Sequence, residues 1–167
     1  MSRELYYCCD LGSMPKVKEL LAGPPGSVNI EHTECNGRTS LIAASESGQE
    51  EMLKYLLQMG ANVHAKNAYG WTALHCSARN GHKSIIMILL KAGIKADAKD
   101  DSQRTALDVA RMHGHDEIVA ILTNPKKALK AAEKAANKDA PPEKTEEEIL
   151  DELYYSDPVE WAKRKGL

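Results

Sequence analysis

Residues 69–93 read YGWTALHCSARNGHKSIIMILLKAG, and this stretch is one copy of a unit that the chain repeats. The segments GRTSL, GWTAL and QRTAL begin 33 residues apart, at Gly37, Gly70 and Gln103. A second set of landmarks keeps the same interval, at Gly48, Gly81 and Gly114. Such a unit is too small to bury its own apolar face, so only stacked neighbours close a core.

Each inner unit has the pattern of two short antiparallel helices and a turn. Thr39 is placed to cap a first helix, which Gly48 ends. A second helix then carries apolar residues at helical spacing until Gly60 ends it. The apolar positions of this second helix are Met52, Leu53, Leu56 and Leu57.

The segment TALH at residues 72–75, within a period of 33, resembles the signature of the ankyrin repeat, with Ala73 in place of the usual proline. The resemblance covers about residues 4–124 and implies an all-α ankyrin-repeat solenoid of helix-turn-helix units with hairpin-like turns. The expected repeats are residues 4–35, 36–68, 69–101 and 102–124. The first repeat is degenerate, and its polar Lys16 suits an end repeat whose outer face meets water.

Three further segments follow the repeats. Residues 125–137 are rich in strong helix formers and begin at Pro125, which predicts a helix that either caps repeat four or projects from it. Residues 138–144 contain two prolines between charges and are expected to be a linker. Residues 145–167 form an acidic–aromatic tail with two predicted short helices.

Composition limits the function classes. The 22 basic and 24 acidic residues leave a formal charge of −2, which provides no general field for nucleic acid. No apolar stretch has the length of a membrane span, and the first residues lack a signal-peptide pattern, so a cytoplasmic protein is expected, with a nuclear or cytoskeleton-associated location as alternatives. The four cysteines show no metal-ligand spacing, which favours small buried thiols in a reducing compartment.

We find no catalytic pattern in the sequence and expect no cofactor or metal. His75 belongs to the TALH signature, and the resemblance implies that its ring holds neighbouring turns together. His82 and His115 each follow a glycine, another position with a structural role in the family. No serine or cysteine stands at motif spacing from a base, and no phosphate-binding loop or dinucleotide fingerprint is present. An enzyme remains the least favoured alternative.

Protein binding is the function that the resemblance implies. In ankyrin-repeat proteins, partners contact the hairpin tips and the exposed side of each first helix, which together form a concave surface. Tyr69 and Trp71 are aromatic residues at central tips, expected to be exposed, and Tyr, Trp and Arg dominate binding hot spots. The alternative is that Trp71 only covers the neighbouring turn. The candidate residues on this surface are Arg38, Tyr69, Trp71, Arg79, Asn80, Arg104, Met112 and His113.

The tail offers a second candidate surface. Its large apolar groups are Leu150, Leu153, Tyr154 and Trp161. This segment is too small to fold alone, so it either packs on the repeats or docks into the groove of a partner as an amphipathic helix.

Two attachment surfaces predict an adaptor, or a fixed subunit of a larger assembly such as a cytoskeletal one. The protein is expected to be a monomer outside its complex. The main alternative is an ankyrin-type inhibitor that occludes an enzyme such as a kinase, for which the concave surface alone suffices.

Overall fold

The computed structural model describes residues 2–23 and 28–136, and regular structure in these residues is helical. Short helices come in pairs, as the repeat pattern predicts. The pairs are α1 (Ser2–Asp10) with α2 (Met14–Leu21), α3 (Ser40–Glu46) with α4 (Glu50–Gln58), α5 (Ala73–Asn80) with α6 (Lys83–Lys91), and α7 (Ala106–Met112) with α8 (Asp116–Thr123). A single-turn helix, η1 (Cys35–Gly37), lies before α3, and α9 (Pro125–Ala136) follows α8.

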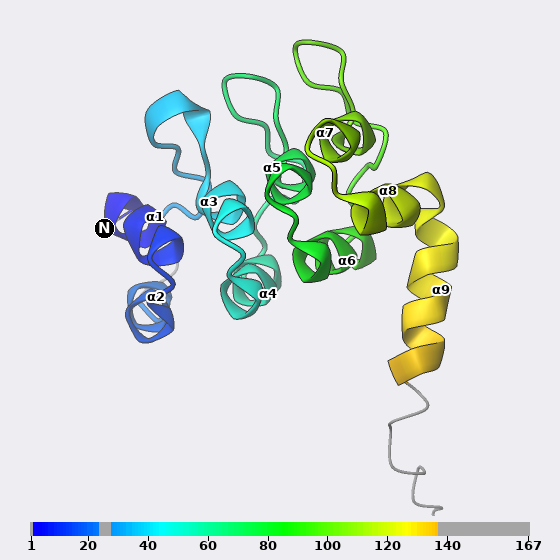
Figure 1. The fold of residues 1–167 in the computed structure, drawn as a ribbon. Helices are drawn as coiled ribbons and strands as arrows, with labels where there is room; N and C mark the ends of the chain where they lie inside the picture. Colours follow the sequence, from blue (N-terminus) through cyan, green and yellow to red (C-terminus); the bar gives the residue numbers. More distant parts are fainter. Residues whose placement is uncertain (1, 24–27, 137–167) are drawn as a thin grey trace, which may run out of the picture. The chain divides into compact units, whose positions relative to one another are not determined.

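The helices of the repeats form two layers (Figure 1). The first helices of successive pairs pack side by side in the order α1, α3, α5 and α7, and each also packs on its own second helix. In the second layer α6 lies between α4 and α8. The all-α solenoid expected from the sequence is therefore confirmed.

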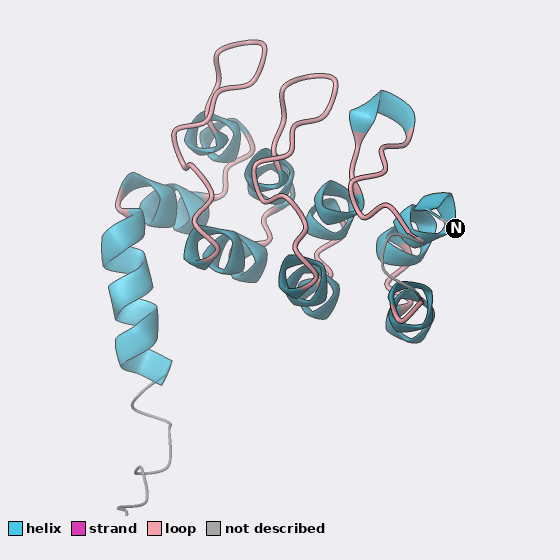
Figure 2. Cartoon of the chain, turned by 180° about the vertical axis from the view of Figure 1, so that it is seen from behind, coloured by secondary structure: helices cyan, strands magenta, loops and turns pink. Residues whose placement is uncertain are grey.

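Three hairpin-like loops, here called fingers, lead into the first helices of repeats two, three and four (Figure 2). Finger one comprises residues 33–39, finger two residues 66–72 and finger three residues 99–105, and in each the first and last residues pair as an isolated bridge. The fingers are joined to one another through the backbone. The Ala68 N–H donates to the Asn36 carbonyl at 2.7 Å, and the Asp101 N–H donates to the Tyr69 carbonyl at 3.2 Å.

Threonines at the ends of the fingers cap the first helices. Oγ1 of Thr39 accepts from the Ile42 N–H at 3.4 Å, and Oγ1 of Thr105 accepts from the Asp108 N–H at 3.3 Å. Each such bond satisfies a backbone donor that the first turn of a helix leaves without a partner inside the helix. The predicted cap at Thr39 is confirmed.

The core lies between the two helix layers and continues through the repeats. Leu5 of the degenerate first repeat is fully buried in it, while Lys16 is exposed, as an end repeat requires. The apolar residues with no exposed area are Leu5, Cys9, Val17, Ile42, Ala43, Ala44, Leu53, Leu56, Ala78, Ile86, Leu89, Ala106 and Ala110.

Contacts divide the chain into two units, residues 1–130 and residues 131–167. Within the first unit, Ala128 and Leu129 of α9 are partly buried against the core. The linker and tail helices expected for residues 138–167 lie outside the described residues. Of the helices described, none has the length and apolar character that crossing a bilayer requires.

Candidate protein-binding groove

A groove of about 390 Å³ lies between the fingers and the first helices α3 and α5. Residues of all three fingers line this groove because backbone hydrogen bonds, repeated every 33 residues, hold neighbouring fingers side by side. Its walls mix aromatic, basic, acidic and amide side chains. The lining residues are Asn36, Arg38, Glu46, Asn67, Tyr69, Trp71, Cys76, Arg79, Asp101, Ser102 and Arg104.

The groove brings together five residues predicted from the sequence: Arg38, Tyr69, Trp71, Arg79 and Arg104. Three other predicted residues do not line it. Asn80 lies at the exposed end of α5 and donates to the Glu46 carbonyl at 2.8 Å, while Met112 and His113 are exposed at the end of α7. The predicted tail residues Leu150, Leu153, Tyr154 and Trp161 lie outside the described residues.

The two aromatic residues of the groove differ in exposure. Tyr69 is 56% exposed, as the tip position predicts. Trp71 is partly buried against the core, and its indole N–H donates to Oδ2 of Asp100 at 3.0 Å, so the expectation of an exposed Trp71 is wrong. The reason is the neighbouring finger, which supplies a buried acceptor directly beside the indole.

Asp100 anchors that neighbouring finger and is only 3% exposed. Its carboxylate accepts from the Arg104 backbone N–H at 2.8 Å and from Nε at 3.0 Å, and it lies 2.9 Å from Nη2 of the same arginine. Burial opposes the charge, but these bonds and the arginine charge hold the pKa of Asp100 below its usual 3.8. Asp100 is therefore a buried anion with charged and neutral donors around it.

The sequence analysis missed Asp100, although a signal was present. Glu34, Asn67 and Asp100 stand 33 residues apart at the start of the tight turn in each finger. Oδ1 of Asn67 accepts from the N–H groups of Tyr69 at 2.9 Å and Trp71 at 3.0 Å. A short polar side chain at this position holds its own turn by such bonds.

The arginines of the groove have different partners. Arg38 forms an ion pair with Glu46 of α3, and Arg104 forms one with Asp100. The guanidinium of Arg79 instead lies over the Trp71 ring, with Cζ 5.8 Å from the ring centroid. Arg79 is exposed, whereas Arg38 and Arg104 are partly buried.

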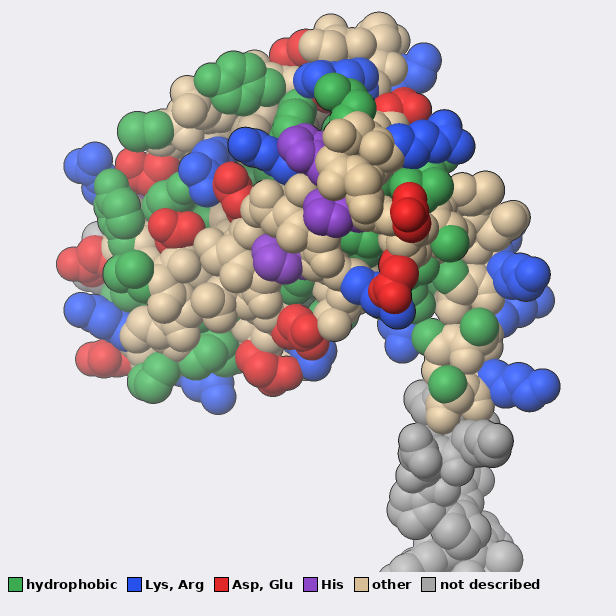
Figure 3. All heavy atoms as spheres, viewed as in Figure 1, with side chains coloured by type: hydrophobic (Ala, Val, Ile, Leu, Met, Phe, Trp, Pro, Cys, Tyr) green, Lys and Arg blue, Asp and Glu red, His purple; other side chains and the backbone are tan. Residues whose placement is uncertain are grey.

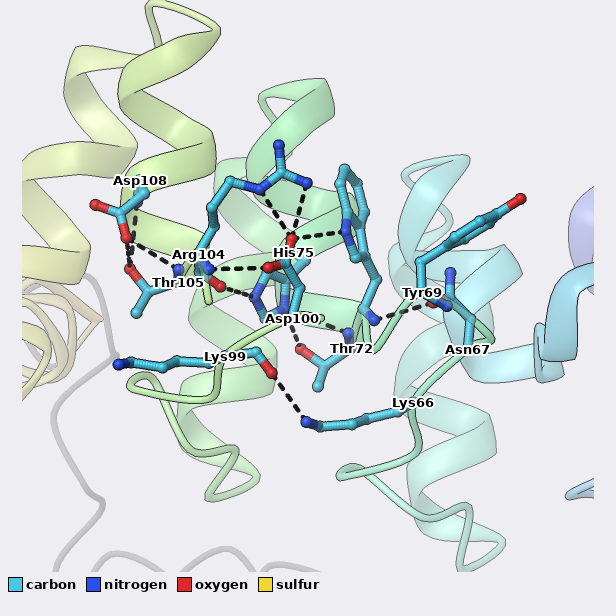
Figure 4. A network of polar contacts seen from close by, with 11 residues as sticks. Lys66, Asn67, Tyr69, Thr72, His75, Lys99, Asp100, Arg104, Thr105 and Asp108 are labelled. Carbon is cyan, nitrogen blue, oxygen red and sulfur yellow. Dashed lines mark hydrogen bonds and ion pairs between the residues drawn. The ribbon is translucent and has the colours of Figure 1, made fainter. Parts of the chain in front are cut away.

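Beneath the groove, His75 joins repeat three to repeat four (Figure 4). Its Nδ1 accepts from the Thr72 N–H at 3.3 Å and lies 2.9 Å from Oγ1 of Thr72. Nε2 therefore carries the proton, and it donates to the Arg104 carbonyl at 3.2 Å. Burial is the main reason that the pKa of His75 lies below its usual 6.5, so the ring is neutral.

A scan against protein families matches residues 41–90 to the family described as ankyrin repeats (many copies). This match covers nearly all of α3 to α6 with finger two between them, and it includes His75 and Thr72 but not Arg104. The chain therefore contains ankyrin repeats. Ankyrin repeats generally mediate protein–protein interaction and are generally not enzymes.

Two further histidines hold this ankyrin stack together at the opposite end of the first helices. Nε2 of His82 donates to the Glu46 carbonyl, and Nε2 of His115 donates to the Arg79 carbonyl, both at 2.9 Å. Each ring thus satisfies a carbonyl at the end of the preceding first helix. Histidine side chains gather on the face of the repeats in Figure 3. The rings of His113 and His115 lie nearly parallel, with centroids 6.5 Å apart.

The cysteines of the ankyrin repeats mostly fit the expected structural role. Cys8, Cys9 and Cys76 are buried, whereas Cys35 is exposed on finger one, contrary to that expectation. Burial raises the pKa of Cys9 and that of Cys76 to about 12, so both are neutral thiols. Across the described part of the chain, no cluster of three or more His, Cys, Asp or Glu residues could hold a metal ion.

Basic and acidic side chains are interspersed over the face of the ankyrin repeats in Figure 3. This face therefore presents a mixed surface rather than the single basic stripe that would neutralise a row of phosphates.

Proposed function

We propose that this ankyrin-repeat protein is a non-catalytic protein-interaction module that binds a partner in the groove between its fingers. The groove supports this proposal because it joins exposed Tyr69 to Trp71 and three arginines in one hollow of about 390 Å³. Aromatic and arginine side chains in a concave site are the groups that carry most of the binding energy at interfaces.

The wider role that we propose is that of an adaptor, or of a fixed subunit of a larger assembly such as a cytoskeletal one, acting in the cytoplasm. Residues Leu150, Leu153, Tyr154 and Trp161 of the tail would form its second attachment surface. The protein itself would be a monomer outside the complex.

The test is affinity capture with variants of the full chain. Tyr69→Ala removes an exposed side chain of the groove, while Tyr7→Ala removes a tyrosine of similar exposure, 47%, on α1 outside it. Trp71 is not substituted, because it packs against the core and donates to Asp100, so its removal would disturb the fold. A third bait carries alanine at all four apolar tail positions.

We expect Tyr69→Ala to lose partners that Tyr7→Ala retains, with an affinity loss of about 2 kcal/mol, or roughly thirtyfold. A different set of proteins lost with the tail variant would support the adaptor. If the tail variant keeps every partner and Tyr69→Ala loses an enzyme, the inhibitor is favoured instead. Equal capture by the two tyrosine variants would remove the groove from the proposal.

A further inference from the structure

The groove contains one arginine whose charge the fold itself does not neutralise. Arg38 is paired with Glu46, and Arg104 is paired with buried Asp100. Among the described residues no carboxylate lies within ion-pair distance of Arg79, and its guanidinium lies over the Trp71 ring. The positive charge available to a ligand is therefore concentrated at Arg79.

The same contact orients Arg79. A guanidinium over an aromatic ring is attracted by the negative face of the ring and forms no ion pair there, so its N–H donors can still make a bidentate bond to a carboxylate. The ring beneath it is fixed in turn, because the Trp71 indole donates to Asp100. Asp100 thus positions Trp71, and Trp71 positions Arg79. A fork held in advance loses less conformational freedom when it binds.

The other charges of the groove limit what the partner can carry. Asp101 and Glu46 also line it, and Asp100 lies beneath. The groove as a whole therefore holds as many carboxylates as arginines, although none of the carboxylates forms an ion pair with Arg79. A ligand with dense negative charge, such as a phosphate dianion, would be repelled by these carboxylates. Exposed Tyr69 adds apolar area beside the cation.

We propose that the groove binds a protein segment that presents a single Asp or Glu next to an apolar side chain, with the carboxylate held by Arg79 and the apolar group packed on Tyr69. This inference rests on the proposed function and names the chemistry of the partner. It makes Arg79 the specificity-determining residue of the groove.

The experiment uses the full chain and a phage-displayed library of random dodecapeptides as the probe. Selected peptides are synthesised with a fluorescent label, and their dissociation constants are measured by anisotropy. The variants are Arg79→Gln, Arg79→Lys, Tyr69→Ala and the control Arg111→Gln, which removes an exposed arginine of α7 that does not line the groove. Circular dichroism checks that each variant keeps the wild-type melting curve.

We expect the selected peptides to share an Asp or Glu beside an apolar residue. Arg79→Gln weakens their binding by about tenfold or more, as loss of hydrogen bonds to a charged group does. Replacing the peptide Glu by Gln has the same effect, and combining the two changes adds little. Arg79→Lys restores part of the affinity, because it keeps the charge without the planar fork. Arg111→Gln binds as the wild type does.

Two failures are distinguishable. Peptides that depend on Tyr69 but carry no carboxylate, or that bind Arg79→Gln as tightly as the wild type, overturn the inference and leave the proposed function standing. If no selected peptide depends on Tyr69, the groove is not the binding surface, and both the inference and the proposed function are refuted.

Discussion

A pair of glycine substitutions separates backbone strain from the contact that joins neighbouring repeats. Gly81 and Gly114 occupy the same turn in repeats three and four, with φ of 81° and 71°. A Cβ on Gly81 would lie 2.9 Å from Cε1 of His115, whereas a Cβ on Gly114 would meet no atom within 4 Å. Gly81→Ala therefore adds strain and displaces an imidazole, while Gly114→Ala adds strain alone.

The expected magnitudes follow from these contacts. A left-handed alanine costs about 1–2 kcal/mol at either position, and the lower entropy of the unfolded alanine chain affects both variants alike. Moving His115 also breaks its bond to the Arg79 carbonyl, which adds about 0.5–1.5 kcal/mol for Gly81→Ala. We expect Gly81→Ala to be less stable than Gly114→Ala by about 1 kcal/mol.

Urea unfolding followed by circular dichroism measures the difference, which corresponds to about 0.3–1 M in the midpoint for a slope of about 1–3 kcal/mol per molar. Adding His115→Ala to each variant completes a double-mutant cycle. In that background the two alanine variants should unfold together, because the ring that Gly81→Ala displaces is gone. Equal midpoints for Gly81→Ala and Gly114→Ala with His115 in place would refute the role of this ring contact.

Gln103 has a φ of 61° at the position where the other fingers have a turn glycine, so Gln103→Gly should raise the unfolding free energy by about 0.5–1 kcal/mol. Ser102→Gly in the same turn is the control and should give no such increase. Equal effects of the two substitutions on the urea midpoint would contradict this prediction. Leu90 is buried in the core that continues through the repeats, so Leu90→Asp should abolish the cooperative thermal transition. A retained sharp transition would show that the stack does not depend on burial of this side chain. The pKa values of His75 and Asp100 both lie below their usual values in the fold, so the unfolded chain binds more protons. Stability should fall as the pH drops below 6.5 because of His75, and again below 3.8 because of Asp100; a His75→Gln variant with the same loss in urea midpoint between pH 7 and 5 would contradict the first step.

Features that depend on local geometry were predictable from the sequence. A glycine after a run of helical positions ends a helix because it adopts a left-handed conformation without strain, and Gly48 and Gly81 do so here. The cap at Thr39 is also local, since donor and acceptor lie three residues apart. The structural roles of His82 and His115 came from the family resemblance, and their bonds to the preceding repeat agree with it.

The exposure of Trp71 could not be judged in this way. The partial burial of its side chain depends on Asp100, which is 29 residues away and contacts the indole only because fingers two and three lie side by side. The repeat period does place Glu34, Asn67 and Asp100 at one position, but their side chains differ, and only Asp100 was found to supply an acceptor to the preceding finger's aromatic ring.

The sequence by itself determined the repeat period, the helix pairs and their caps, because a hydrophobic face and a turn are set by residues a few positions apart. It also named five side chains that the groove assembles. Only the tertiary structure decided which arginines of that groove are paired with carboxylates. Glu46 pairs with Arg38 and Asp100 pairs with Arg104, while Arg79 lies over the Trp71 ring. Ion pairs form between side chains that the stacking of repeats brings together, so the sequence does not show which of the three arginines has a carboxylate partner.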